Sequence, residues 1–321
     1  MVETRDEVAV VLANWNSIGH IERCLNALYA QSHLPSEVVV VDNGSTDGSL
    51  ELIQRKFPQV STLSLPENRG IPVAWNLGIE KTGSPYVLIL NTDVFLDRDF
   101  LFTSLTAVRG EPDIGSVAAK VFKADTGTID YVGLYLQRRF RVVNSGNSTE
   151  REFVFSGTGA VMFLRRAMLE DLRVSGEYFD EWFFAYGEDT DLAWRAQLRG
   201  WRCLFVPEAV AHHIGSASQD GRVRVVEKTA FFQRHLWKNR YVTILKNASP
   251  GVFVSLLPWL ILAEALSWPY VLFRIPHRFH IFILSHLDVL RNLGKVLKKR
   301  AEIQRARKVG ARHILRLFRG F

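Results

Sequence analysis

Four short apolar runs alternate with helical spacings between residues 8 and 90. The runs VAVVLA (8–13), EVVVVD (37–42), VSTLSL (60–65) and YVLIL (86–90) have the length and β-branched content of buried strands. Apolar residues at helical spacing lie between them, over 18–28, 50–57 and near 72–82. Strands joined by single helices need right-handed crossovers and form parallel sheets. The pattern predicts an α/β fold with a mainly parallel sheet flanked by helices.

Polar residues stand where each of these runs ends. In a parallel α/β sheet the ligand binds beyond the carboxyl ends of the strands. Any one polar strand end is explained equally well by a turn or a helix cap, but four at one edge favour a ligand site. The residues, in strand order, are Asn14 and Asn16, then Asp42, then Asn68, Arg69 and Gly70, and finally Asn91, Thr92 and Asp93.

Asp93 is the most informative of these residues, because burying a carboxylate at a strand end is costly unless its charge is compensated. No Walker loop and no G-x-G-x-x-G follows the first strand, which weakens the nucleotide-hydrolase and dehydrogenase interpretations. A nucleotide diphosphate can still bind where a metal replaces the glycine-rich loop. Because Mg²⁺ and Mn²⁺ are held by one or two carboxylates together with phosphate oxygens and waters, we expect Asp93 to hold such a cation.

A second group of acids lies in YFDEWFFAYGEDTDLAWRAQLRGW (178–201), at the start of a helical pattern. The helix dipole favours acids there, and this explains Asp191 well. It explains less well why Glu188 and Asp189 follow a run of aromatic residues. Poor solvation beside such residues raises a carboxyl pKa toward that of a useful general base. Together with the nucleotide site, this favours catalysis over capping for Asp189.

The charge of the chain changes sign along its length. Residues 1–215 carry 20 Lys and Arg against 28 Asp and Glu, a net charge of −8, whereas residues 216–321 carry 20 against 5, a net charge of +15. Only Cys24 and Cys203 are present, without metal or redox spacing, which favours a reducing compartment. The acidic start of the chain is unlike a signal peptide.

The C-terminal part combines apolar and basic residues. The segment 251–273 is very apolar, contains two prolines and the tryptophans Trp259 and Trp268, and precedes a basic tail. It offers no uninterrupted run of about 20 apolar residues, so we expect a peripheral anchor on an anionic membrane surface rather than a spanning helix. The interleaved aliphatic residues argue against nucleic acid as a partner.

With these residues placed, the chain resembles the family 2 glycosyltransferases, which have the GT-A (Rossmann-like) fold, and among them the rhamnosyltransferase-like members. The resemblance covers roughly residues 7–218, and its order and spacing are more specific than any one motif. Its carriers are NWN (14–16), VVVVDNGSTDGS (38–49), PENRG (66–70), WNLGI (75–79), LNTDV (90–94), SGTGAVMFLRR (156–166), FDEWFFAYGEDTDLAWR (179–195) and HHIGSAS (212–218).

The resemblance implies sugar transfer from a nucleotide diphosphate sugar to an acceptor hydroxyl, with inversion at the anomeric carbon. It assigns Asp93 and His213 to the divalent metal, although Asn91 replaces the first acid of a full D-x-D motif. It makes Asp189 the general base, with Glu188 as the alternative. Nucleotide-sugar binding falls to Asn14, Asn16, Asp42, Asn68, Arg69, Gly70, Asn76, Asn91 and Thr92, and the acceptor side to Gly157, Thr158, Gly159, Trp182 and Phe183. A merely polar role for His213 and an ordinary turn at residues 157–159 are the alternatives.

We therefore expect a GT-A catalytic domain over residues 1–218, its first half for the nucleotide sugar and its second for the acceptor. A basic, aromatic, helical region that associates with membrane follows over residues 219–321. Attachment to the cytoplasmic face of the inner membrane favours a polyprenyl-diphosphate-linked saccharide of the cell envelope as acceptor. The resemblance favours dTDP-rhamnose as donor over a UDP-sugar. Two alternatives stay open: a polyprenyl-phosphate glycosyltransferase that uses a UDP-sugar, and a non-catalytic nucleotide-sugar-binding scaffold.

Overall fold

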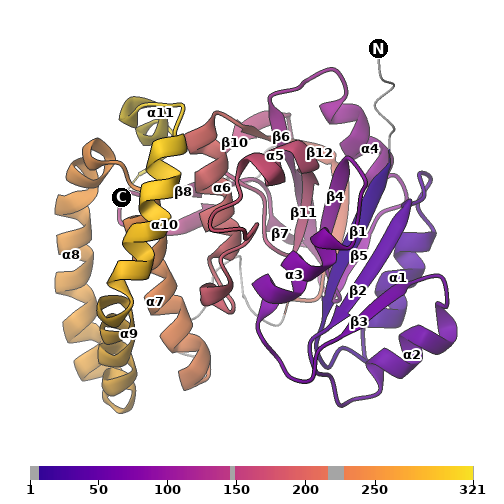
Figure 1. Cartoon of the computed structure of the whole chain (residues 1–321), viewed down its shortest axis with the longest axis horizontal. Coiled ribbons are helices and arrows are strands. Elements are labelled where there is room, and N and C mark those ends of the chain that lie inside the picture. The colour runs from indigo at the N-terminus through magenta and orange to yellow at the C-terminus, as the bar shows by residue number, and fades with distance from the viewer. Residues whose placement is uncertain (1–6, 145–148, 216–227, 321) are drawn as a thin grey trace.

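A computed structural model describes residues 7–144, 149–215 and 228–320 of the chain (Figure 1). Its centre is a ten-stranded sheet in which β10-β12-β6-β11-β4-β1-β2-β3 are hydrogen-bonded neighbours, with β5 paired to β12 and β7 paired to β6. The strands are β1 (Val8–Asn14), β2 (Glu37–Asp42), β3 (Ser61–Ser64), β4 (Tyr86–Asn91), β5 (Val94–Leu96), β6 (Ile114–Lys123), β7 (Ile129–Tyr131), β10 (Glu152–Val154), β11 (Val161–Arg165) and β12 (Arg202–His213). A separate hairpin joins β8 (Leu134–Leu136) to β9 (Val142–Asn144).

The four apolar runs of the N-terminal part form parallel neighbours, as their alternation with helices predicts. Strand β1 pairs in parallel with β2 and β4, and β2 pairs in parallel with β3. The second half of the sheet is mixed, because β11 runs antiparallel to both β4 and β6, whereas β6 and β12 are parallel. The predicted α/β class is confirmed, and the antiparallel strands belong to the half of the chain in which no strand–helix alternation was visible.

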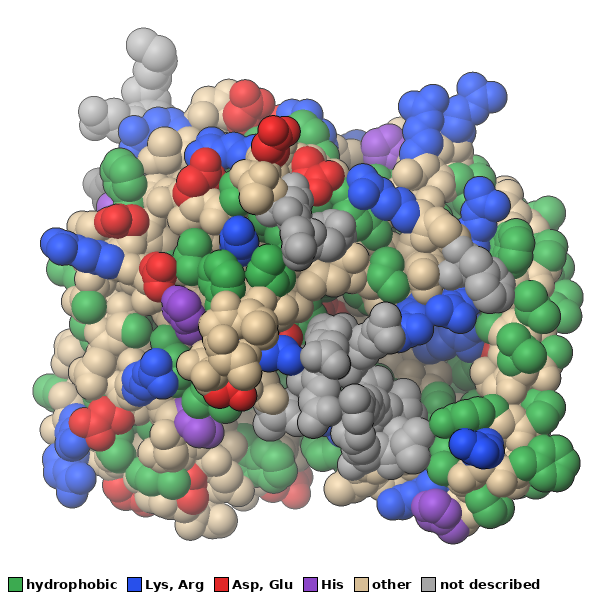
Figure 2. Space-filling view, turned by 180° about the vertical axis from the view of Figure 1, so that it is seen from behind, with side chains coloured by type: hydrophobic (Ala, Val, Ile, Leu, Met, Phe, Trp, Pro, Cys, Tyr) green, Lys and Arg blue, Asp and Glu red, His purple; other side chains and the backbone are tan. Residues whose placement is uncertain are grey.

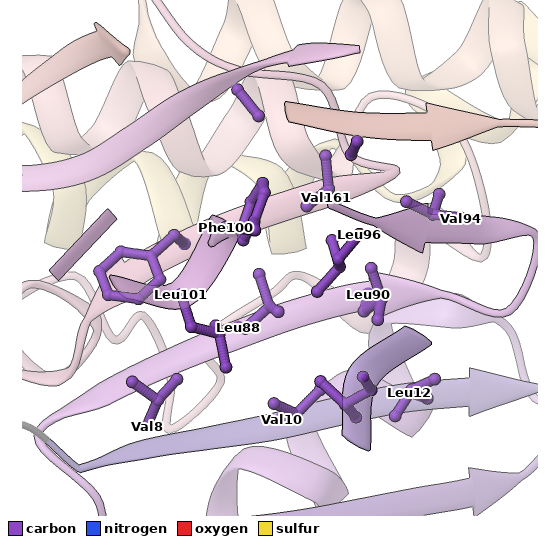
Figure 3. Packing of buried hydrophobic residues seen from close by; sticks show 14 of the residues in the cluster. Val8, Val10, Leu12, Leu88, Leu90, Val94, Leu96, Phe100, Leu101 and Val161 are labelled. Carbon is purple, nitrogen blue, oxygen red and sulfur yellow. The ribbon is translucent and has the colours of Figure 1, made fainter. Parts of the chain in front are cut away.

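Helices cover both faces of this sheet, which explains why its strands are apolar without a polar alternation. On one face Val8, Val10 and Leu12 pack with residues of α1 (Ile21–Tyr29), α2 (Ser49–Lys56) and α4 (Phe100–Val108). Figure 3 shows Phe100 and Leu101 of α4 above Leu88 and Leu90 of β4. On the other face Val11 and Ile89 pack against α3 (Ile71–Glu80), α5 (Arg166–Asp171) and α6 (Glu188–Arg199).

The C-terminal helices stand beside the sheet domain and share a core with it (Figure 1). They are α7 (Ala230–Asn247), α8 (Pro250–Arg274), the short turn η3 (Pro276–Arg278), α9 (Phe279–Arg291), α10 (Leu293–Ala306) and α11 (Ala311–Leu315). Trp194 and Leu198 of α6 pack in one cluster with Val252 of α8 and Ile303 of α10. The predicted boundary at residues 218 and 219 lies outside the described residues.

Helix α8 is longer than the sequence pattern suggested. It runs for 25 residues through Pro258 and Pro269, and among the described residues it alone has the length and apolar composition to cross a membrane. An interior proline removes one backbone hydrogen bond, which here does not end the helix. Only 11% of its most apolar window is buried. Its outward side chains form the apolar edge on the right of Figure 2, and they include Val254, Ile261, Leu262, Leu266, Trp268, Tyr270, Leu272 and Phe273.

Candidate functional site

The structure brings Asp93 and His213 together at the carboxyl edge of the sheet. Asp93 lies in the turn between β4 and β5, and His213 ends β12, which pairs with β5. The His213 Nε2 and Asp93 Oδ2 atoms are 3.4 Å apart. The neighbouring His212 instead contacts Asp97 at 3.0 Å, on the more exposed side of the strand. The geometry thus selects the same histidine of the pair as the sequence resemblance does.

A third residue, Asp130, fixes the orientation of His213. Its Oδ2 atom lies 2.9 Å from His213 Nδ1, and both side chains are buried. Burial alone would lower the pKa of His213, but hydrogen bonds and charge from Asp130 and Asp93 raise it to about 9. Although burial opposes it, His213 in turn holds the pKa of Asp93 below its usual value. Nothing in the sequence pattern singled out Asp130, which is distant along the chain and follows no motif.

These side chains fit a divalent cation that is bound by the protein on one side and by a diphosphate on the other. They offer one carboxylate, one imidazole held from behind by a second carboxylate, and the buried oxygen Asp130 Oδ1 without a hydrogen-bond partner. Within the described residues no group of three or more His, Cys, Asp or Glu is arranged to hold a metal. The remaining ligands would therefore come from phosphate and water, which is the coordination that Mg²⁺ prefers.

Asp189 stands at the first turn of α6, after the left-handed Gly187. Its Oδ2 atom accepts a hydrogen bond from the Gly159 backbone N–H at 3.0 Å, and its Oδ1 accepts from the Thr190 N–H at 2.6 Å. The residue after Gly159 is Ala160, whose carbonyl accepts from the N–H of Asn91 at 2.9 Å. Two hydrogen bonds and a few residues of chain therefore connect Asp189 to the turn that carries Asp93.

Glu188 and Asp189 differ in how they are solvated and bonded. Burial, with a contribution from the Asp189 charge, raises the pKa of Glu188 to about 8, and its Oε2 atom is buried without a hydrogen-bond partner. Burial also raises the pKa of Asp189, but backbone N–H groups of Thr190 and Gly159 oppose that rise by stabilising the carboxylate. These backbone hydrogen bonds favour the charged form of Asp189 over that of Glu188, so Asp189 is the better placed of the two to act as a carboxylate.

On the predicted role of Asp189 as general base, we expect a Gly159→Ala substitution to lower sugar transfer by about 10²-fold, because a 1 Å displacement of a catalytic group can have that effect. A Cβ atom at this position would lie 2.9 Å from Asp189 Oδ2 and 3.2 Å from its carboxyl carbon. The measurement is the initial transfer rate at saturating donor. Gly294→Ala is the matched control, since nothing lies within 4 Å of its added Cβ. Equal rates for the two variants would contradict the expectation.

The predicted nucleotide-side residues of the first two strands form one polar cluster. The Asn14 Nδ2 donates to Asp42 Oδ1 at 2.7 Å and to the Ser49 hydroxyl at 2.9 Å, and both Asn14 and Asp42 are buried. The second Asp42 oxygen accepts from the Ser45 N–H at 3.1 Å. Asn16 is exposed, with a left-handed φ of 50°, and accepts from the Thr46 N–H. Asn14 and Asp42 thus bond to neighbouring residues below the surface, and Asn16 is the exposed member of the group.

The segment Asn68–Gly70 is held in place by Asn43, which the sequence reading missed. Asn43 Oδ1 accepts from the Arg69 N–H at 2.9 Å, and its Nδ2 donates to the Gly70 carbonyl at 3.1 Å. Gly70 has a φ of 94°, and an added Cβ would lie 2.7 Å from the Phe184 carbonyl oxygen. The Asn68 side chain caps the Gly70 N–H, and the Arg69 side chain is exposed. Asn91 and Thr92 are half-buried beside Asp93.

Asn76, predicted to bind the nucleotide sugar, instead bonds to other parts of the protein. Its amide accepts from the Phe179 N–H at 2.8 Å and donates to the Phe179 carbonyl at 2.8 Å and to Glu181 Oε1 at 3.2 Å. Both amide hydrogens are thus occupied within the protein, and the side chain is buried. Asn76 therefore ties α3 to the segment before α6, and these contacts leave it no amide hydrogen to offer a nucleotide.

The predicted acceptor-side residues fall into two groups. Gly157, Thr158 and Gly159 lie at the Asp189 carboxylate and are buried or half-buried. Phe183 is completely buried among residues of α7, α9 and α10, so its ring cannot contact an acceptor, and that prediction is corrected. Trp182 is half-buried, with Lys238 Nζ 4.5 Å from its ring. Both aromatic residues, in the short turn η1 (Glu181–Phe183), join the C-terminal helices to the sheet domain.

Comparison with known proteins places the chain among enzymes that transfer sugars. A family model described as Glycosyl transferase family 2 matches residues 9–173, a little over half of the chain. Poly-beta-1,6-N-acetyl-D-glucosamine synthase of Staphylococcus aureus is 24% identical over 220 residues, covering 65% of this chain and 50% of the synthase. N-acetylglucosaminyl-diphospho-decaprenol L-rhamnosyltransferase of Mycobacterium tuberculosis is 26% identical over 245 residues, covering 65% of this chain and 76% of that protein. The chain spans about half the length of the synthases it matches.

Solved structures support the fold. TarS 1–349 from S. aureus superposes with a TM-score of 0.56 at 17% identity, covering 83% of this chain and 74% of that one. The mannosyltransferase PcManGT from Pyrobaculum calidifontis, in complex with GDP-Man and Mn²⁺, superposes with a TM-score of 0.54 at 18% identity, covering 97% of this chain and 78% of that one. These likenesses confirm the predicted GT-A fold.

Proposed function

Since the chain belongs to glycosyl transferase family 2, we propose that it is an inverting, metal-dependent glycosyltransferase of cell-envelope polysaccharide synthesis. It moves a sugar from a nucleotide diphosphate sugar to a hydroxyl of a lipid-linked saccharide. One observation carries the proposal: the Asp93–His213 pair and the Asp189 carboxylate stand at one sheet edge, connected through Gly159, Ala160 and Asn91.

In this reaction the acceptor oxygen forms a bond to the anomeric carbon while the bond from that carbon to the diphosphate oxygen breaks. Asp189 takes the proton of the acceptor hydroxyl, and its two N–H partners hold the carboxylate in place. Asp93 and His213 would hold Mg²⁺ or Mn²⁺, which supplies positive charge to the departing diphosphate. Asn16 offers an exposed side chain to the nucleoside, above the buried Asn14–Asp42 pair, and Asn68, Arg69 and Gly70 lie next to this cluster.

For the donor we favour dTDP-rhamnose over a UDP-sugar, on the likeness to the mycobacterial rhamnosyltransferase. For the acceptor we favour a polyprenyl-diphosphate-linked saccharide, because that relative is named for a sugar carried on a decaprenyl diphosphate. Assays of transfer from dTDP-rhamnose and from UDP-sugars to this acceptor test both choices.

A lipid-linked acceptor agrees with a peripheral position of the protein on an anionic membrane, at the cytoplasmic face. On the outer side of α8, Ile261, Leu266 and Phe273 are 60%, 60% and 77% exposed. An apolar face of this size is unusual for a helix surrounded by water. The region from residue 216 onward carries the net charge of +15. Apolar side chains beside tryptophan and basic residues suit the headgroup zone of such a membrane.

A thermal-shift series tests the donor site. We expect dTDP and UDP, and their sugars, to raise the melting temperature of the wild-type protein only with Mg²⁺ or Mn²⁺. A ligand at 100 times its dissociation constant adds about 2.7 kcal/mol to the free energy of unfolding. The Asp93→Ala variant should lose this metal-dependent gain. Asp97→Ala is the matched control, because Asp97 contacts a histidine of the same strand but lies exposed. A metal-independent gain in the wild type, or an equal gain in Asp93→Ala, would refute the proposal.

A further inference from the structure

The segment that leads into the candidate base has an unfavourable backbone. Phe184 has φ 64° and ψ −56°, Tyr186 has φ 69°, and Gly187 has φ 89°. Positive φ is uncommon and unfavourable for residues other than glycine, so surrounding contacts must hold the conformation of Phe184 and Tyr186. Glu188 and Asp189 follow at once, so the path of residues 183–187 decides where the base carboxylate points.

One side chain of the C-terminal helices gathers the carbonyl groups of this segment. The amide nitrogen of Asn239, in α7, lies 3.0 Å from the Phe183 carbonyl oxygen, 2.9 Å from that of Ala185 and 2.7 Å from that of Tyr186. Asn239 is 2% exposed. The side-chain amide of Asn239 has two hydrogens, so the three carbonyl groups share these two donors. The backbone between them contains the positive φ angles of Phe184 and Tyr186. No aliphatic side chain of similar size could make these contacts.

Helix α7 also holds the chain just after the base. Asn247 Nδ2 donates to Asp191 Oδ1 at 2.8 Å, and Lys246 Nζ lies 3.0 Å from Asp191 Oδ2. Asp191 follows Asp189 by two residues and is completely buried. The base is therefore bracketed by α7, with Asn239 upstream and the Lys246–Asn247 pair downstream.

The same segment touches the donor side. The Phe184 carbonyl accepts from the Ile71 N–H at 2.8 Å, next to Gly70. The Phe184 ring stacks on His235 of α7, with ring centres 5.1 Å apart. Residues 183–187 thus lie between the segment Asn68–Gly70 and the helix that carries Asn239.

From this geometry we propose that Asn239 is a positioning residue for Asp189, so that the C-terminal helices form part of the transfer site as well as the membrane-associating region. The inference rests on the proposed function, because it needs Asp189 to be the base. Asn239 touches neither substrate in this scheme, and acts by fixing the backbone between Phe183 and Tyr186.

The test compares Asn239→Leu with Val252→Ala in steady-state transfer from dTDP-rhamnose to N-acetylglucosaminyl-diphospho-decaprenol, or from a UDP-sugar if that is the active donor. Val252 is completely buried in the core shared by α8 and α6, so its truncation destabilises the protein without touching residues 183–187. We expect Asn239→Leu to lower kcat by about 10²-fold with the KM for the donor unchanged. Val252→Ala should keep kcat within about twofold of the wild type, as expected for a site it does not contact.

A second variant is needed if Asn239→Leu does not fold. A missing donor-induced thermal shift would report that loss of folding. Asn239→Ser keeps one hydroxyl donor and is expected to lower kcat by about tenfold, again without a change in donor KM. If the folded Asn239 variants match Val252→Ala in kcat, the positioning role is wrong. An inactive wild-type protein would refute the proposed function itself, so the activity of the wild type separates that failure from a failure of the positioning role.

Discussion

Replacing Asp189 with asparagine is expected to reduce sugar transfer by about 10²–10⁴-fold, the usual contribution of a general base, while nucleotide donor binding is retained. Asparagine has nearly the shape of aspartate but cannot take the proton of the acceptor hydroxyl. The Asp189 carboxylate accepts hydrogen bonds from Gly159 and Thr190, whereas Asn14 and Asp42 bond to each other, so donor affinity should not depend on the charge of Asp189. Transfer rates and the metal-dependent thermal shift, measured on the same preparation, separate the two effects.

Glu188→Gln is the matched control for this substitution. Because Glu188 is already protonated near neutral pH, with a pKa raised to about 8 by burial and the neighbouring Asp189, its amide replacement should keep most of the transfer activity. The opposite ranking of the two variants would make Glu188 the base. Full activity of Asp189→Asn on a polyprenyl phosphate would favour the alternative in which the acceptor is the lipid phosphate, which needs no base for a hydroxyl. Absence of any metal-dependent transfer would favour the non-catalytic scaffold.

The strand ends could be predicted because one physical rule links them. Parallel strands separated by single helices place their carboxyl ends at one edge, so the sequence alone predicts that Asn14, Asp42 and Asp93 lie close together. Asn14 and Asp42 are directly hydrogen-bonded, and Asp93 follows β4, which pairs with the neighbouring β1. The approach of His213 to Asp93 came only from family resemblance, since it depends on β12 returning to pair with β5.

The contacts that support the site could not be read in the same way. Asp130 meets His213 across 83 residues, and Asn239 meets the Tyr186 carbonyl across 53, with no local pattern to mark either residue. The family resemblance places Phe183 on the acceptor side, yet the C-terminal helices bury it. Periodicity shows which face of an element is apolar, but not which distant element covers that face.

Helix α8 illustrates a further limit. Its prolines suggested interruption, because an isolated helix loses a hydrogen bond and gains a clash at each interior proline. In the structure the inner side of the helix packs Val252 and Leu256 into the shared core, and Glu264 pairs with Arg240 at 2.5 Å. Such tertiary contacts override local preference, so the 25-residue length was not visible from composition.

The largest expected loss of stability is for Lys246→Met. Lys246 is 1% exposed, and its Nζ atom lies 2.5 Å from Asp180 Oδ2 and 3.0 Å from Asp191 Oδ2. Removing one partner of a buried ion pair leaves the other charge uncompensated and typically costs about 3–5 kcal/mol of the free energy of unfolding. Lys308→Met is the matched control, because Lys308 is 60% exposed and 3.9 Å from Asp171, where a surface pair contributes about 0–1 kcal/mol. Urea unfolding at neutral pH measures both.

The pH dependence identifies the ion pair as the cause of that loss. Burial alone would raise the pKa of Asp180, but Lys246 and Lys299 hold it well below its usual 3.8. A depressed carboxyl pKa stabilises the folded state above pH 3.8, and this contribution disappears as the pH falls below that value toward the folded pKa. In the Lys246→Met variant that depression is weaker, so the stability difference from wild type should be largest near neutral pH and shrink in acid. A difference that stays constant as the pH falls would mean that lost packing around the lysine side chain, rather than its charge, accounts for the effect.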